Sequence, residues 1–125
     1  MSHDVVADAL NKMMNAHKAG KESVVVRVHS KLLLSILALG KLRGYVSDYK
    51  VDGREMKIEI GSKFNACKSV KPRYLVKSKD IMKYVRRYLP ARDMGVLIIS
   101  TSQGLMTHHS AIEKNIGGSI VAYFY

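Results

Sequence analysis

The chain has 125 residues, 47% of them apolar, which is enough for one compact domain or two small halves with a hydrophobic core. Its longest apolar runs fall far short of the roughly 18 residues of a membrane-spanning helix, and no charged leader precedes an apolar stretch at the N-terminus. The one cysteine, Cys67, allows no internal disulfide and no metal-binding spacing, so we expect a soluble cytoplasmic protein without a metal or cofactor.

Charge is the strongest signal in the composition, because 21 Lys and Arg against 10 Asp and Glu give a net charge of +11. Residues 1–62 have a net charge of +3 and residues 63–125 one of +8, and residues 63–92 hold ten basic side chains against Asp80 alone. Such self-repulsion destabilises a small fold unless a polyanion neutralises it, so we expect RNA or DNA as the partner. An anionic membrane surface is the second candidate, and a solvated basic surface is the plain alternative.

The first half of the sequence predicts a helix, a strand, a second helix and a hairpin. Apolar residues at helical spacing favour a helix at residues 4–19, and the β-branched run SVVVRVH favours a strand at residues 23–29. Ser30 can cap a helix at residues 31–42, which we expect Gly44 to end. Strands at residues 45–51 and 54–60 then flank Asp52-Gly53, the strongest short hairpin signal.

The second half begins after residues 61–70, a stretch of small and polar residues that breaks the pattern. We expect, in order, a short strand at 72–76, a helix at 79–89 capped by Ser78, a buried strand at 95–101, a short helix at 108–115 and a final strand at 119–125. The sum is an α+β protein of two small packed halves. The expected domains are residues 1–62, an α-β-α-β-β unit, and residues 63–125, a basic and mainly β unit with short helices.

The predicted helix at residues 79–89 carries basic side chains opposite its apolar side, namely Lys83, Arg86 and Arg87. Basic groups neutralise phosphates, and the neighbouring Tyr84 and Tyr88 can stack on unpaired bases. The alternative is an ordinary amphipathic helix with a solvated outer face.

Ser30 and Lys31 stand at the predicted start of the second helix. Backbone N–H groups at a helix N-terminus favour phosphate, and Lys31 adds a cation. A plain helix cap is the alternative, which the local sequence alone favours.

The stretch from Ser100 to Ile112, STSQGLMTHHSAI, follows a buried strand and is expected to form a hydroxyl-rich turn before a helix. It has neither the spacing of a nucleotide phosphate loop nor that of a nucleophile elbow. A hydrolase triad of Ser102, His108 and Asp93 can be assembled only on paper, since a triad is recognised by geometry.

Short hydroxyl side chains offer a better interpretation of this turn. Ser100, Thr101 and Ser102 can reach ribose hydroxyls, phosphate oxygens and base edges, and Gly104 lets the backbone approach a ligand closely. The structural alternative is a hydrogen-bonded turn that caps the following helix. A DNA-binding regulatory module is a third hypothesis, but the most basic helix has tyrosines where groove-reading polar side chains would be expected.

The sequence GVLIISTSQGLMT at residues 95–107 resembles the C-terminal motif of the ribosomal small-subunit protein eight family, a pattern close to Ser-Thr-Ser-x-Gly-x-Met-Thr. The pair Gly117-Gly118 before an apolar strand, the N-terminal run at residues 4–10 with Asn15 after it, and Ser30-Lys31-Leu32 match as well, so the resemblance covers essentially the whole chain. The ending AYFY and the Thr-His after the methionine resemble the archaeal branch more than the bacterial one.

This resemblance implies two α+β halves and a non-enzymatic protein that binds the central domain of small-subunit (16S) rRNA as a primary binder and helps to assemble the platform. It implies a monomer beside neighbouring ribosomal proteins in the cytoplasmic ribosome, with a messenger RNA that mimics the rRNA site as a further partner. The family's RNA contacts map onto Ser30, Lys31, Ser100, Thr101, Ser102, Gly104, Gly117 and Gly118. At the glycine pair, close approach to RNA and tight packing are both open.

Overall fold

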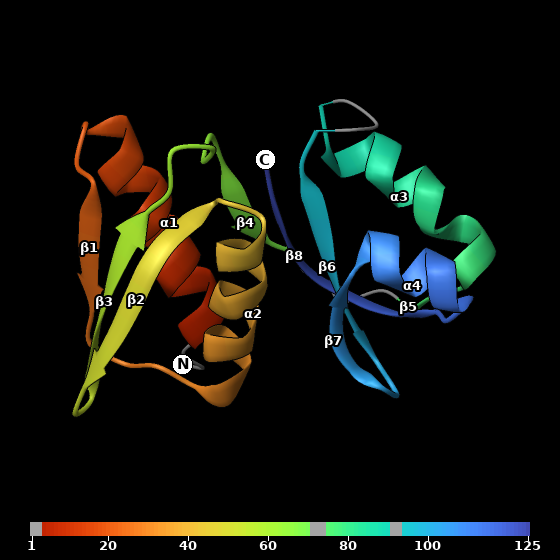
Figure 1. Cartoon of the computed structure of the whole chain (residues 1–125), viewed down its shortest axis with the longest axis horizontal. Coiled ribbons are helices and arrows are strands. Elements are labelled where there is room, and N and C mark those ends of the chain that lie inside the picture. The colour runs from red at the N-terminus through yellow and green to blue at the C-terminus, as the bar shows by residue number, and fades with distance from the viewer. Residues whose placement is uncertain (1–3, 71–74, 91–93) are drawn as a thin grey trace. The chain divides into compact units, whose positions relative to one another are not determined.

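The computed structural model describes residues 4–70, 75–90 and 94–125, and these residues form an α+β fold with four α-helices, a three-stranded sheet and a five-stranded sheet (Figure 1). The chain divides into two compact units, Met1–Lys68 and Ser69–Tyr125. The α+β class expected from the sequence is thus confirmed. The expected division into independent domains at residues 62 and 63 stays a prediction, because a compact unit need not fold alone.

The first unit follows the predicted order of helix, strand, helix and hairpin. Helix α1 spans Val5–Lys18 and is capped by Asp4, whose carboxylate accepts the Ala7 N–H at 3.0 Å. Strand β1 spans Ser23–Val26, helix α2 Lys31–Leu42, strand β2 Val46–Asp52 and strand β3 Glu55–Ile60. The antiparallel sheet has the order β1-β3-β2, and Gly53, at φ +62°, supplies the left-handed position in the hairpin turn.

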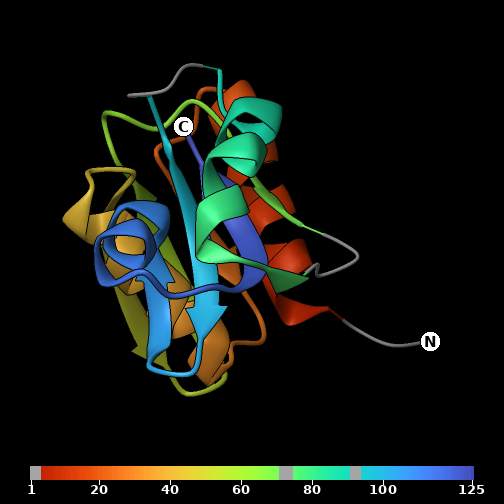
Figure 2. The same cartoon turned by 90° about the vertical axis from the view of Figure 1, so that its right-hand side faces the viewer.

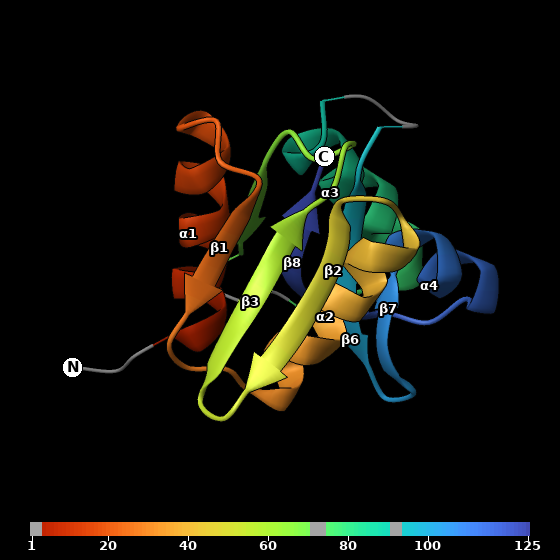
Figure 3. The same ribbon diagram turned by 60° about the vertical axis from the view of Figure 1, so that its left-hand side comes forward.

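Both helices of the first unit pack on one face of its sheet, as Figure 3 shows. Apolar side chains from the buried stripe of each helix meet those of β3, and all are almost fully buried: Val6, Leu10, Met13, Leu33, Ile36, Leu37, Met56 and Ile58. Burying such side chains is the main stabilising contribution to a unit of this size.

Strand β1 is shorter than expected, because it ends at Val26 and not at residue 29. The length of the neighbouring strand β3 explains this difference. Val26 pairs with Met56, and β3 begins at Glu55, directly after the hairpin turn, so little strand remains for the following residues to pair with. Val28 is accordingly more than half exposed.

The second unit is built around the strands β6, Val96–Thr101, and β8, Gly118–Phe124. The strand order of the five-stranded sheet is β4-β8-β6-β7, with β5 paired to the start of β8. Strand β5 spans Leu75–Val76 and β7 Gly104–Thr107, while β4, Cys67–Ser69, begins in the last two residues of the first unit. Helices α3, Ile81–Tyr88, and α4, His108–Lys114, lie on one face of this sheet (Figure 2). Beneath them lies a core of Val76, Ile81, Val85, Leu89, Leu97, Ile99, Met106, Ala111 and Ile120.

The start of α3 differs from the sequence prediction, and the cap of α4 was not predicted. Ser78 does not cap α3; a 3₁₀ turn, Ser78–Asp80, precedes that helix, and the Ser78 hydroxyl donates to the side-chain oxygen of Asn115 at 2.7 Å. Helix α4 is capped by Thr107, whose hydroxyl accepts the Ser110 N–H at 3.3 Å. Strands β4 and β7 were not predicted, and of the strand expected at residues 72–76 only Leu75 and Val76 lie within the described residues.

Cys67 is a buried structural residue. Its thiol donates to the Leu10 carbonyl at 3.3 Å, and burial raises the pKa of the thiol far above its ordinary value, so the group stays protonated. Within residues 4–70, 75–90 and 94–125, none of the helices has both the length and the apolarity that a bilayer crossing requires.

Candidate nucleic-acid interface

Five residues that the sequence analysis singled out come together at one open hollow of about 590 Å³ in the second unit. The hollow lies where β5, the β6–β7 hairpin and the start of β8 meet. It is lined by Leu75, Val76, Lys77, Ser78, Ser100, Thr101, Ser102, Gly117 and Gly118. The predicted hydroxyl residues and the glycine pair, which lie in separate parts of the sequence, therefore share one surface.

The hydroxyl-rich stretch is the turn of a hairpin, which corrects the expectation of a turn that leads into a helix. Thr101 pairs with Gly104 across the turn, and Ser102 and Gln103 form its tip. The Thr101 hydroxyl donates to the Gly104 carbonyl at 2.8 Å and accepts the Gln103 N–H at 3.1 Å. Gly104 has φ +105°, a left-handed conformation that favours glycine.

The hydroxyls of this stretch consequently have different roles. The Thr101 hydroxyl holds the turn together. It can bind a ligand only if it gives up one of its two hydrogen bonds within the turn. Ser100 and Ser102 are exposed, and neither hydroxyl has a hydrogen-bond partner among the described residues. These two side chains can therefore donate to phosphate or ribose oxygens at no loss to the fold.

The glycine pair provides room for neighbouring protein backbone. A Cβ at Gly117 would overlap the Val76 carbonyl oxygen, and one at Gly118 would overlap the Ser100 carbonyl oxygen and lie 2.9 Å from the Ile99 side chain. Of the two roles left open by the sequence, tight packing of β5 and β6 against β8 is the one that the geometry requires. Both glycines also line the hollow.

Lys77 was not identified from the sequence, although it brings a cation to the hollow. Lys77 is exposed, and so is Leu75 two residues before it, at 85%. Both residues reach the hollow because β5 pairs with β8, with Leu75 opposite Ser119 and Val76 opposite Gly118. This pairing joins distant parts of the chain, and no local pattern in the sequence indicates it.

The basic face of α3 is a second surface of the same unit. Lys83, Arg86 and Arg87 are all exposed, as predicted. The Lys83 ammonium lies 3.4 Å from the Asp80 carboxylate, a surface ion pair of small energetic value, and the Arg87 guanidinium lies 5.7 Å from the centroid of the Tyr88 ring. Both basic groups remain accessible to phosphates.

The tyrosines of α3 are less available for base stacking than the sequence suggested. Tyr84 and Tyr88 are half-buried, pack against the apolar core and stack on each other with ring centroids 6.4 Å apart. Tyr88 also stacks on Tyr123 of β8 at 5.5 Å. Their ring faces therefore contact mainly other protein groups.

Ser30 and Lys31 lie in the first unit, at the start of α2. The Ser30 hydroxyl accepts the Leu33 N–H at 3.2 Å, so Ser30 caps α2 as predicted, and a phosphate contact at this helix start stays a prediction. Lys31 is exposed at the first position of the helix, where its ammonium can meet a phosphate.

The two described members of the hypothetical hydrolase triad, Ser102 and His108, have different surroundings. His108 is 1% exposed, and its Nδ1 accepts the Leu97 N–H at 3.0 Å, so the ring anchors the start of α4 to β6, while Ser102 is exposed at the hairpin tip. Asp93 lies outside the described residues. Among the residues that the structure does describe, no three His, Cys, Asp or Glu side chains gather as metal ligands.

Known proteins are similar to the chain over nearly its whole length. Residues 4–125 match the family model described as ribosomal protein S8. The small ribosomal subunit proteins uS8A and uS8B of Schizosaccharomyces pombe are each 36% identical to the chain over 125 residues, which cover 97% of this chain and 96% of each relative. These two relatives are eukaryotic, so the expected archaeal type is not confirmed. Because the family model and both relatives cover nearly the whole chain, it belongs to the ribosomal protein S8 family.

Proposed function

We propose that this chain, a non-enzymatic structural protein of the small ribosomal subunit, binds the central domain of the subunit's rRNA directly and helps to assemble the platform. The observation that carries the proposal is the hollow, because it gathers Ser100, Ser102 and the pair Gly117-Gly118 on one surface. These residues were matched separately to family motifs, and their convergence is independent support for a shared role.

Two kinds of contact divide the work of recognition. Phosphate contacts by Lys77 and by the α3 face, Lys83, Arg86 and Arg87, give affinity for any RNA. The small hydroxyl groups of the hollow, Ser100 and Ser102, read a particular RNA shape. Because an A-form duplex hides its base edges, that shape is a bulge or another distorted site, not a regular helix.

The experiment that tests the proposal measures binding of the full chain to a central-domain rRNA fragment and to a scrambled RNA of equal length, across a salt series. We expect a large preference for the fragment that persists at high salt, because shape recognition does not depend on counterion release. If both RNAs bind equally and binding vanishes as the salt concentration rises, the protein binds RNA only through nonspecific charge, and the proposal is refuted.

Matched variants separate the two kinds of contact. Ser102→Ala should weaken binding of the cognate fragment by about 2- to 10-fold and leave the scrambled RNA unaffected. Arg86→Ala should weaken both RNAs equally and reduce the slope of log K against log salt by about one. Ser35→Ala and Lys50→Ala, exposed positions in the first unit, serve as the serine and the cation control. Identical effects of Ser102→Ala and Arg86→Ala on both RNAs would contradict this division.

The same surface supports further expectations about partners. Within the subunit, we expect a cytoplasmic ribosomal monomer that touches neighbouring ribosomal proteins, and a messenger RNA that mimics the rRNA site would bind in the same hollow. The C-terminal AYFY and the Thr-His after Met106 favour an archaeal over a bacterial type. Excess duplex DNA should fail to displace the rRNA fragment; displacement would favour the DNA-binding module instead.

A further inference from the structure

Strand β2 is an edge strand of the first unit's sheet, because the strand order is β1-β3-β2. It has seven residues, and the side away from β3 has no strand partner among the described residues. A free edge of this length offers its outward N–H and C=O groups to a strand of another molecule, and proteins usually block such edges.

The register shows which groups point outward. Asp52 and Glu55 flank the two-residue turn at Gly53, so they exchange both hydrogen bonds of a closely spaced pair. In an antiparallel ladder such pairs alternate with pairs that make no bond between them. Counting back from Asp52, the Tyr49–Ile58 pair is of the second kind, so the Tyr49 N–H points away from β3.

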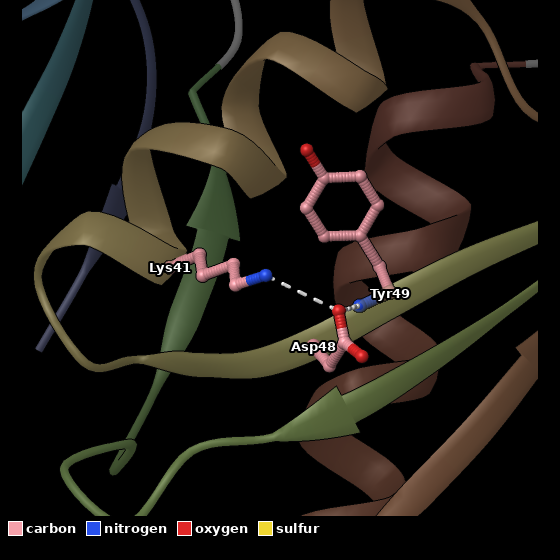
Figure 4. A network of polar contacts seen from close by, with 3 residues as sticks. All are labelled: Lys41, Asp48 and Tyr49. Carbon is pink, nitrogen blue, oxygen red and sulfur yellow. Dashed lines mark hydrogen bonds and ion pairs between the residues drawn. The ribbon is translucent and has the colours of Figure 1, made fainter.

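That outward N–H is already occupied. It donates to the Asp48 carboxylate at 2.8 Å, and the same carboxylate oxygen lies 3.3 Å from the Lys41 ammonium at the end of α2 (Figure 4). The Lys41 ammonium also lies 5.9 Å from the centroid of the Tyr49 ring, so it is positioned by two groups of the strand. These contacts hold the pKa of Asp48 below its ordinary value, the Tyr49 N–H foremost and Lys41 second.

The strand has a second irregularity beside this contact. The register shifts between Val46 and Asp48, which leaves Ser47 as an extra residue opposite β3. A β-bulge of this kind bends an edge strand and breaks the flat row of groups that another strand would need. The bulge and the occupied N–H are adjacent, and Lys50 adds an exposed charge two residues further on.

We propose that the Lys41–Asp48 pair is an edge lock, which closes β2 against strand pairing with a second copy of the chain. The Asp48 carboxylate takes the place of the acceptor that an incoming strand would present to Tyr49. The Lys41 ammonium holds the carboxylate there and lies where an incoming strand would pass. All of these residues belong to the first unit, so the inference does not rest on RNA binding by the second.

The test compares the full chain with its Asp48→Ala variant by hydrogen exchange and by sedimentation over a range of protein concentrations. We expect the Tyr49 amide to exchange roughly 2- to 10-fold faster in the variant, as for a lost hydrogen bond. We also expect the variant to form dimers or larger species as its concentration rises, while the unmodified chain stays monomeric. A monomeric variant with unchanged exchange at Tyr49 would overturn the proposal.

Asp80→Ala is the matched control, because it removes a different surface ion pair, Asp80–Lys83 at 3.4 Å, and changes the net charge by the same amount without touching a strand edge. It should stay monomeric; association equal to that of Asp48→Ala would point to charge alone. Asp48→Asn keeps an oxygen acceptor for Tyr49 and should stay monomeric as well. Should Asp48→Ala fail to fold, Lys41→Met gives the same exchange readout, and an unchanged rate there counts against the lock.

Discussion

Replacement of Gly118 by alanine tests whether the glycine pair serves the fold. Gly118 is the first residue of β8, and an added Cβ would overlap the Ser100 carbonyl oxygen and lie 2.9 Å from the Ile99 side chain. Both obstacles belong to β6, which pairs with β8 through Ser100 and Ser119. The extra methyl group must therefore push the two central strands of the second unit apart.

The expected size follows from the nature of the obstacle. A carbonyl oxygen in a paired strand cannot rotate away as the end of a flexible side chain could, so the relief must come from a backbone shift. Overpacking of this kind costs about 1–3 kcal/mol of unfolding free energy. Urea unfolding followed by circular dichroism measures it, with Ser119→Ala as the control at the neighbouring position of the same strand.

A loss below about 0.5 kcal/mol in Gly118→Ala, within the range of ordinary surface substitutions, would refute the packing argument. If cognate RNA binding were lost at the same time, the glycine would be needed for close approach of RNA, the role that the family resemblance left open. Loss of stability with an intact RNA preference at low temperature, where the variant remains folded, is the result that we expect.

Three further predictions concern residues outside the hollow. His108→Ala should lower the unfolding free energy by about 1–3 kcal/mol in urea titrations, because it leaves the buried Leu97 N–H without its acceptor. A change near zero would contradict the hydrogen bond between Leu97 and His108. The raised pKa of Cys67 keeps its thiol protonated, so a thiol reagent at neutral pH should label it only as fast as the protein opens, and labelling at the rate of a free thiol would exclude this burial. The pKa of Asp48 is lowered in the folded state, so its stabilising contribution is present above the unfolded value near 3.8 and is lost as the pH falls through the lowered one; the stability difference between the unmodified chain and Asp48→Asn should shrink, and not grow, as the pH falls below 3.8.

The elements that the sequence predicted best are those that local signals determine. Helix α2 begins and ends as predicted, because Ser30 is a strong cap and the apolar residues keep helical spacing. The hairpin of β2 and β3 was predicted from Asp52-Gly53, but its turn lies one residue later, at Gly53-Arg54, because Asp52 pairs with Glu55 as the last residue of β2. Strand β7 has no such signal: its four residues, Gly104 to Thr107, become a strand only because β6 pairs with them. Propensity is a weak guide for short strands whose pairing decides their structure.

The candidate site shows the same limit. The hydroxyl turn was visible because Ser100, Thr101 and Ser102 are adjacent in the sequence. Lys77 was missed because it enters the hollow through the pairing of β5 with β8, which joins distant parts of the chain. A single sequence shows the charge of its residues and the spacing of its motifs. It does not show which distant segments pair, and that pairing brings Lys77 to the hollow.

The structure also changes how substitutions at the family motif residues should be interpreted. Thr101 and Ser30 use their hydroxyls to hold a turn and a helix, and Gly118 makes room for the Ser100 backbone. Replacing any of these can weaken RNA binding through the fold alone. Ser102 has no such task among the described residues, and so a loss of cognate binding in Ser102→Ala, at unchanged stability, reports on recognition itself. Binding measurements on these residues therefore need a stability measurement beside each one, because a hydroxyl or a glycine that supports the fold can lower RNA binding without contacting RNA.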